Sequence, residues 1–104
     1  NCSGEASKTG LPASELADLL AEIPIYPNVA GKLKGLMTIP PYRDGPGGSR
    51  PFFKELRQLR DQYLAAGLLP PGSGLSMGMS SDFETAVAEG ATVVRIGSAI
   101  YRQD

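Results

Sequence analysis

The feature that most constrains this chain of 104 residues is the alternation of helical patterns with short, continuously apolar runs. Helical spacing of apolar residues predicts helices from Pro12 to Ile23 and from Pro51 to near Gly67, and a third over 81–89. Apolar runs, each expected to form a strand, occupy residues 36–39, 75–79 and 92–97. Runs without polar alternation are typical of strands covered on both faces. The alternation therefore predicts βα units and a parallel sheet.

Local signals place the helix ends. Pro12 suits a helix start, and Ser81 with Glu84 matches an S-x-x-E capping box that would open the third helix. On the second helix, Arg57 and Asp61 are spaced as an ion pair on a solvated face. The core face of that helix is expected to carry Phe52, Leu56, Leu59 and Tyr63.

The number of strands limits the architecture. Three apolar runs, with a further strand expected to finish near Asn1, are too few for a closed eight-stranded barrel but make half of one. A small, open, doubly wound sheet is the alternative. The chain opens on Asn1 instead of Met, and its first ten residues look like a strand end running into a loop. We therefore expect a fragment, with a processed or tagged terminus as the alternative.

Composition excludes several classes of function. The net charge is −1 with scattered Lys and Arg, so there is no electrostatic case for nucleic acid. No apolar run approaches the roughly 18 residues of a membrane span. Histidine is absent, which removes His-based triads and most zinc and iron sites, and we expect no metal. The single cysteine, Cys2, fits a reducing, cytoplasmic compartment and is expected to be structural.

Two of the apolar runs end in small residues, at Ser80-Ser81 and at Gly97-Ser98. Parallel strands point their carboxyl ends to one edge, so these ends should lie near each other. Ser80 and Ser81 lead into a predicted helix N-terminus, which attracts anions. Gly97 permits close approach of a ligand, and Ser98 offers a hydroxyl and an amide. The arrangement predicts a phosphate site, with ordinary turn and capping chemistry as the alternative.

Arg95 lies two residues before the end of the last apolar run. A guanidinium in such surroundings needs a partner, because burying it unpaired is costly. One hypothesis is a contact to a bound anionic or aromatic ligand, and the alternative is an ion pair with an acidic residue elsewhere. Met77 and Met79 flank Gly78 and are expected to pack in the core, with a wall against a flat ligand as the alternative.

The stretch LSMGMSSDFETAVAEGATVVRIGSAIY, residues 75–101, closely resembles the carboxyl-terminal signature of the YggS/PROSC family, the pyridoxal phosphate homeostasis proteins. SGEASKTG and GLMTIPP resemble earlier parts of that family in the same order, so the resemblance covers essentially the whole chain. The family resembles the amino-terminal barrel of alanine racemase. The resemblance implies that residues 1–104 are the C-terminal half of a TIM (β/α)8 barrel that holds pyridoxal 5′-phosphate (PLP) at the carboxyl face of its strands.

The resemblance also implies roles for individual residues. Ser80 would hydrogen-bond the cofactor phosphate, and Gly97 and Ser98 would supply backbone amides and a hydroxyl to the same group. Arg95 would face the pyridine nitrogen, where it disfavours ring protonation and weakens the electron sink that amino-acid chemistry requires. This fits a family of PLP carriers and regulators without established racemase activity, so no catalytic residue is expected.

In the family, PLP forms a Schiff base with a lysine on the first strand. None of the four lysines, which are Lys8, Lys32, Lys34 and Lys54, lies in such a motif. These 104 residues are therefore expected to bind PLP weakly unless the other half is present separately. The expected function is intracellular PLP homeostasis, with apo PLP enzymes as partners. The alternatives are a PLP-dependent racemase of the same barrel type and a cofactor-free half barrel that dimerises through its strand edges.

Overall fold

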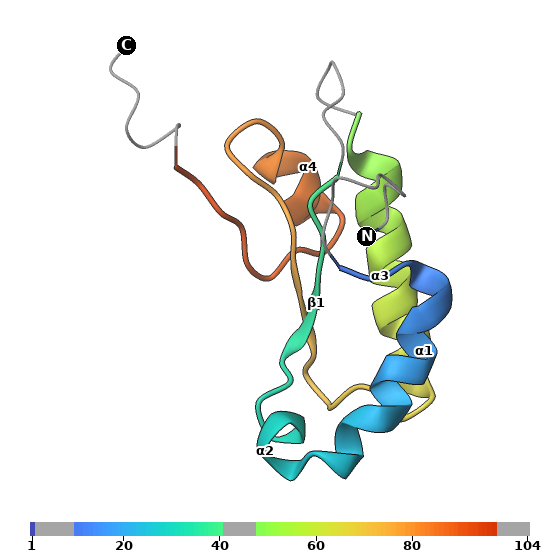
Figure 1. Cartoon of the computed structure of the whole chain (residues 1–104). Helices are drawn as coiled ribbons and strands as arrows, with labels where there is room; N and C mark the ends of the chain where they lie inside the picture. The colour runs from blue at the N-terminus through green and yellow to red at the C-terminus, as the bar shows by residue number, and fades with distance from the viewer. Residues whose placement is uncertain (2–9, 41–47, 98–104) are drawn as a thin grey trace.

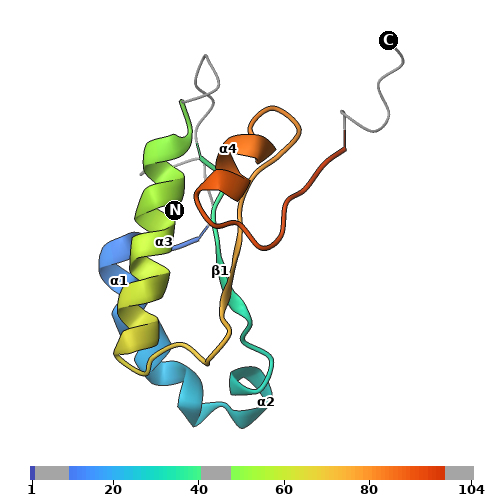
Figure 2. The same ribbon diagram turned by 180° about the vertical axis from the view of Figure 1, so that it is seen from behind.

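The computed structural model describes residues 1, 10–40 and 48–97. Helices and strands follow one another as α1 (Ala13–Glu22), the 3-10 helix η1 (Ile23–Ile25), α2 (Pro27–Ala30), β1 (Gly35–Met37), α3 (Arg50–Ala65), β2 (Gly74–Ser76) and α4 (Phe83–Ala88). The helices α1 and α3 lie side by side next to the strands (Figures 1 and 2). The predicted alternation of helices and strands is confirmed.

The strands β1 and β2 pair in parallel, as the sequence predicts. Leu36 lies opposite Leu75, and Met37 lies opposite Ser76. The strands are shorter than the apolar runs that predicted them. The first strand ends at Met37 and not at residue 39, and the second ends at Ser76 and not at residue 79.

The third predicted strand, over 92–97, is reduced to one parallel bridge between Ser76 and Val93. Beyond it, the Met77 N–H donates to the Val93 carbonyl at 3.1 Å, and the Arg95 N–H donates to the Gly78 carbonyl at 2.9 Å. These bonds carry the last described segment alongside the end of β2.

The start of α1 and the end of α3 match the sequence signals. The helix α1 starts immediately after Pro12 and gives way to a 3-10 turn that contains Pro24. The 16-residue helix α3 starts after Ser49, and the chain leaves it at Gly67, whose φ of +78° is one that L-residues rarely adopt. Both boundaries therefore have a local cause that can be read in the sequence.

The core lies between α3, β2 and α4. Its buried members are Phe53, Leu56, Leu75, Met77 and Ala86. Phe53 is wholly buried and Phe52 only half-buried, so the prediction that Phe52 marks the core face was wrong. The pair Phe53 and Leu56, three residues apart, faces the sheet instead. The helices α3 and α4 both pack on the face of the sheet that carries Leu75.

A buried carboxylate joins the end of α4 to α3. Glu89 is 4% exposed, and its Oε1 lies 2.5 Å from Arg50 Nη1 and its Oε2 3.5 Å from Arg57 Nη1. The predicted pair between Arg57 and Asp61 was wrong, since Asp61 contacts Arg60. A carboxylate shielded from water attracts a guanidinium more strongly than an exposed one, so Arg57 turns to Glu89.

Within the ranges 10–40 and 48–97, no helix is both long and apolar enough to cross a membrane. The same part of the chain contains no group of three or more His, Cys, Asp or Glu side chains placed to hold a metal ion.

Candidate functional site

Ser80 and Gly97 meet at the carboxyl edge of the sheet. The Gly97 N–H donates a hydrogen bond to Ser80 Oγ at 3.2 Å. Ser80 is half-buried and Gly97 is exposed, so the contact lies at the surface. The predicted proximity of the two Gly/Ser ends is thus observed for these two residues. The fourth predicted cofactor-binding residue, Ser98, lies outside the described residues.

Gly78 allows the chain to turn out of the sheet towards Ser80. Its φ is +106°, and a Cβ built there would lie 2.7 Å from Ala86 Cβ and 3.2 Å from Val94 Cγ1. Only glycine satisfies both the backbone angle and the space. On either side of this turn, Met77 is buried in the core and Met79 is 45% exposed. The packing role predicted for both methionines is therefore confirmed for Met77 and wrong for Met79.

The turn that contains Ser80 is closed by Asp82. The Met79 N–H donates to Asp82 Oδ1 at 2.8 Å, and the Asp82 N–H donates to the Met79 carbonyl at 3.1 Å. The second carboxylate oxygen, Oδ2, accepts a hydrogen bond of 2.9 Å from Ser49 Oγ, at the start of α3. This long-range contact was missed by reasoning from the sequence, because nothing local links residues 33 positions apart.

The capping box predicted from Ser81 and Glu84 was wrong. Asp82 occupies the N-cap position of α4 in place of Ser81, and no side-chain capping bond forms there. The Asp82 side chain does not cap the helix because its carboxylate accepts bonds from the Met79 N–H and Ser49 Oγ. The helix α4 has only six residues, so we do not assign anion binding to its dipole. The groups that could bind an anion here are the Ser80 hydroxyl and the Gly97 amide.

Arg95 is exposed, although its apolar neighbours predicted a buried guanidinium. That prediction failed because the segment that carries Arg95 follows α4 and lies at the edge of the sheet alongside the end of β2, where the side chain is open to solvent. The three ion pairs among the described residues join Arg50 and Arg57 to Glu89, and Arg60 to Asp61. The alternative of an ion pair between Arg95 and one of the described carboxylates is therefore not observed.

The lysines show no sign of a covalent cofactor site in the described part of the chain. Lys32, Lys34 and Lys54 are exposed, and none of them belongs to the turn that carries Ser80. Lys8 and Cys2 lie outside the described residues.

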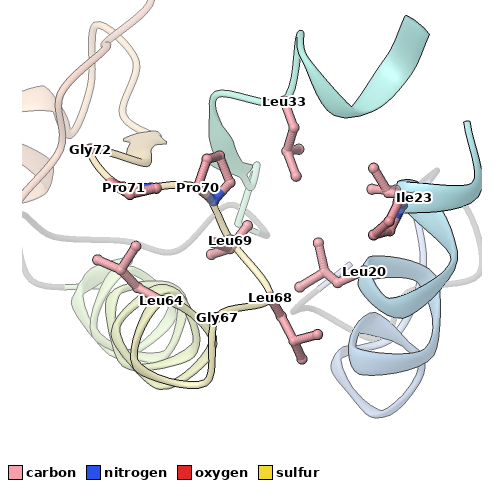
Figure 3. Close-up of a pocket in the computed structure, with 11 residues that line it drawn as sticks. Leu20, Ile23, Leu33, Leu64, Gly67, Leu68, Leu69, Pro70, Pro71 and Gly72 are labelled. Carbon is pink, nitrogen blue, oxygen red and sulfur yellow. The ribbon is translucent and has the colours of Figure 1, made fainter. Parts of the chain in front are cut away.

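An apolar hollow of about 560 Å³ opens at the other end of the strands (Figure 3). Leu20 and Ile23 approach it from α1 and η1, and Leu33 approaches from the segment before β1 (Figure 3). The rest of its wall is formed by residues 64 and 67–72 and by Pro24. Because these segments precede the strands, the hollow faces the amino ends, away from Ser80 and Gly97.

A family model and curated relatives both connect this chain with proteins of known family. Residues 3–104 match the family model described as alanine racemase, N-terminal domain. The pyridoxal phosphate homeostasis protein of Aquifex aeolicus is 48% identical over 105 residues, which cover 97% of this chain and 43% of that protein. The human protein of the same name is 43% identical over 104 residues, with 97% and 37% covered. The chain thus spans less than half the length of these relatives.

Solved structures agree with this relationship. A protein from Bifidobacterium adolescentis has a TM-score of 0.78 at 40% identity, over 94% of this chain and 39% of that one. PipY from Synechococcus elongatus, solved with PLP bound, has a TM-score of 0.71 at 33% identity, over 92% and 44%. These likenesses support a TIM-barrel-like α/β fold. The chain therefore belongs to the alanine racemase N-terminal domain family, and its resemblance to the pyridoxal phosphate homeostasis proteins of the YggS/PROSC type is confirmed.

Proposed function

We propose that the whole protein containing this chain binds PLP and serves PLP homeostasis as a carrier without catalytic activity of its own. The observation that carries the proposal is the 3.2 Å hydrogen bond from the Gly97 N–H to Ser80 Oγ at the carboxyl edge of the sheet. A hydroxyl and a backbone amide from neighbouring segments are thereby held within reach of one anion. The PLP complex of PipY and the names of the curated relatives support PLP as the ligand.

The described residues fit a phosphate group. A Cβ built at Gly97 would meet no atom within 4 Å, so a ligand can approach the backbone there. The Gly97 N–H donates to Ser80 Oγ in this structure, so a phosphate oxygen in that space would accept from the Ser80 O–H and would take over the Gly97 N–H from that bond. Charge-assisted hydrogen bonds of this kind are the strong ones. Exposed Arg95, on the same segment as Gly97, adds a positive charge. The resemblance assigns Ser98 to the same group as a further donor.

We assign Arg95 to the pyridine nitrogen of the cofactor. A guanidinium carries donors and no acceptor, and it keeps its charge at all ordinary pH values. It can therefore donate a hydrogen bond to an unprotonated ring nitrogen but cannot accept a proton from a protonated one. PLP, when bound, supplies an electron-withdrawing ring, and that ring is a weaker electron sink when its nitrogen is unprotonated.

We also propose that residues 1–104 form the C-terminal half of a barrel. Met37, Ser76 and Val93 form one row across the sheet, on the face opposite the core residue Leu75 and the half-buried Leu36 that packs against the core. Met37 is 53% exposed and Val93 54%, so this row has little apolar cover among the described residues. In a complete barrel this face would lie in the packed interior. The share of the relatives' length that the chain spans supports the same proposal.

The test of the proposed function is a titration of the whole protein with PLP and with pyridoxal, which lacks the phosphate. We expect PLP to bind more tightly than pyridoxal, and Ser80→Ala to weaken PLP binding about tenfold, the loss expected when one hydrogen bond to a charged group is removed. The adjacent, exposed Ser81 provides the matched control, and Ser81→Ala should stay within about twofold. Equal affinities for PLP and pyridoxal, or unchanged PLP affinity in Ser80→Ala, would overturn the proposal. Sustained racemisation of alanine would favour the racemase alternative.

A further inference from the structure

We propose that Asp82 is a positioning residue for the phosphate cradle, by which we mean Ser80 and Gly97. Its carboxylate ties the turn that carries Ser80 to the first residue before α3. This inference rests on the proposed function, because the cradle must bind phosphate for its positioning to matter. It adds two residues, Asp82 and Ser49, to the set that determines cofactor affinity.

Both oxygens of the Asp82 carboxylate are used. Oδ1 accepts from the Met79 N–H at 2.8 Å, and Oδ2 accepts from Ser49 Oγ at 2.9 Å. The Asp82 N–H returns a bond of 3.1 Å to the Met79 carbonyl. Ser80 lies within this closed turn, and its Oγ accepts the bond from Gly97. The carboxylate therefore fixes the segment from which the cradle hydroxyl projects.

Ser49 provides a rigid anchor for that turn. It is 8% exposed and directly precedes α3, whose Phe53 and Leu56 belong to the core. The turn itself lies at the surface, with Met79 45% exposed and Ser81 exposed. Without the bond from Ser49 to Asp82, the turn would be held to α3 only indirectly, through the packing of α4 against α3. A hydroxyl that is already held in place loses less entropy on binding a ligand, so the bond should raise affinity by preorganisation.

The geometry of Asp82, and not its charge, is the property that the proposal requires. A carboxylate close to a phosphate repels it, so the charge alone would weaken binding. Asparagine can reproduce both contacts, because its carbonyl can accept from the Met79 N–H and its NH₂ can donate to Ser49 Oγ. Asp82→Asn should therefore retain the affinity that Asp82→Ala loses.

The experiment measures PLP and pyridoxal affinity in the whole protein carrying Asp82→Ala, Ser49→Ala or Asp82→Asn. Ser49→Ala removes one part-buried hydrogen bond, and Asp82→Ala removes that bond and the one from the Met79 N–H. We expect each variant to weaken PLP binding about fivefold to tenfold and to change pyridoxal binding less than about twofold. Asp82→Asn should stay within about threefold of the parent for PLP. Asp61→Ala, which removes an exposed carboxylate on α3, is the matched control and should have no effect.

The outcomes separate this inference from the proposed function. If Ser80→Ala loses PLP affinity while Ser49→Ala and Asp82→Ala keep it, the positioning role is wrong and the proposed function stands. If Ser80→Ala itself keeps PLP affinity, the proposed function fails. Equal weakening of PLP and pyridoxal would indicate general damage to the fold, and loss in Asp82→Asn as large as in Asp82→Ala would show that an amide of the same shape cannot replace the carboxylate. Either result overturns the inference. Should Asp82→Ala not fold, Ser49→Ala decides, because it leaves the bonds between Met79 and Asp82 intact.

Discussion

The Gly97 N–H and Ser80 Oγ are joined by a hydrogen bond of 3.2 Å, although the two residues are 17 positions apart in sequence. The parallel bridge at Val93 and the bond from the Arg95 N–H to the Gly78 carbonyl bring the two segments together. A hydroxyl and an amide thus converge at the carboxyl edge of the sheet, which is where α/β folds bind their ligands. The functional proposals depend on this convergence.

Gly97→Ala is expected to separate binding from folding. A Cβ at this position meets no atom within 4 Å, so the free energy of unfolding should change by less than about 0.5 kcal/mol. The same methyl group would enter the space proposed for the phosphate, and PLP affinity should fall by about tenfold or more, as overpacking costs about 1–3 kcal/mol. Urea unfolding and PLP titration of the whole protein measure the two effects. Unchanged affinity would show that no ligand approaches the backbone here.

Gly78→Ala is expected to destabilise the fold strongly. The alanine Cβ would lie 2.7 Å from Ala86 Cβ in the core, at a φ of +106°. We expect the free energy of unfolding to fall by about 2–4 kcal/mol from strain and overpacking together. Gly72→Ala is the control, because its φ is +80° and its Cβ would meet no atom within 4 Å. That variant should lose about 1 kcal/mol from the backbone alone. Equal losses in the two variants would show that the contact with Ala86 is unimportant.

Glu89→Gln is expected to weaken the contact between α3 and the end of α4. Glu89 is 4% exposed and pairs with Arg50 and Arg57, whose side chains are 44% and 38% exposed. Because solvent screens the two guanidinium groups, the loss should be about 1–2 kcal/mol, below the value for a fully buried pair. Chemical denaturation measures it. The exposed Glu84 gives the control, and a loss in Glu84→Gln equal to that in Glu89→Gln would contradict a specific role for the buried carboxylate.

Arg95→Ala is expected to weaken PLP and pyridoxal binding by the same factor, about threefold to tenfold, because the proposed contact is to the ring that both ligands share. Stability should hardly change, since the side chain is exposed. Lys54→Ala, which removes an exposed cation from α3, is the control for a general charge effect. A selective loss of PLP affinity in Arg95→Ala would place the guanidinium at the phosphate instead of the ring nitrogen.

The parts of the fold that could be predicted are those with local causes. Pro12 and Gly67 mark helix ends because their own backbone preferences act there. The meeting of Ser80 and Gly97 could be expected because all strands of a parallel sheet point their carboxyl ends to one edge. These inferences need only periodicity, turn chemistry and the direction of the strands.

The parts that could not be predicted depend on contacts between distant residues. Ser49 and Asp82 are 33 positions apart, and Arg50 and Glu89 are 39 apart, so no local pattern indicates either pair. The contact with Ser49 also engages the carboxylate of Asp82, the residue that occupies the N-cap position of α4 in place of the predicted Ser81. The exposure of Arg95 depends on which side of its segment finds a partner strand, and the apolar run around it carries no such information.

The most direct test of the central claim is the amide resonance of Gly97 in a ¹H–¹⁵N correlation spectrum of the whole protein, recorded during titration with PLP and with pyridoxal. A phosphate that accepts a hydrogen bond from this N–H should move the resonance downfield and saturably with PLP, while pyridoxal leaves it nearly unchanged. A Gly97 resonance that stays in place while PLP binds elsewhere would contradict the claim that Ser80 and Gly97 hold the cofactor phosphate.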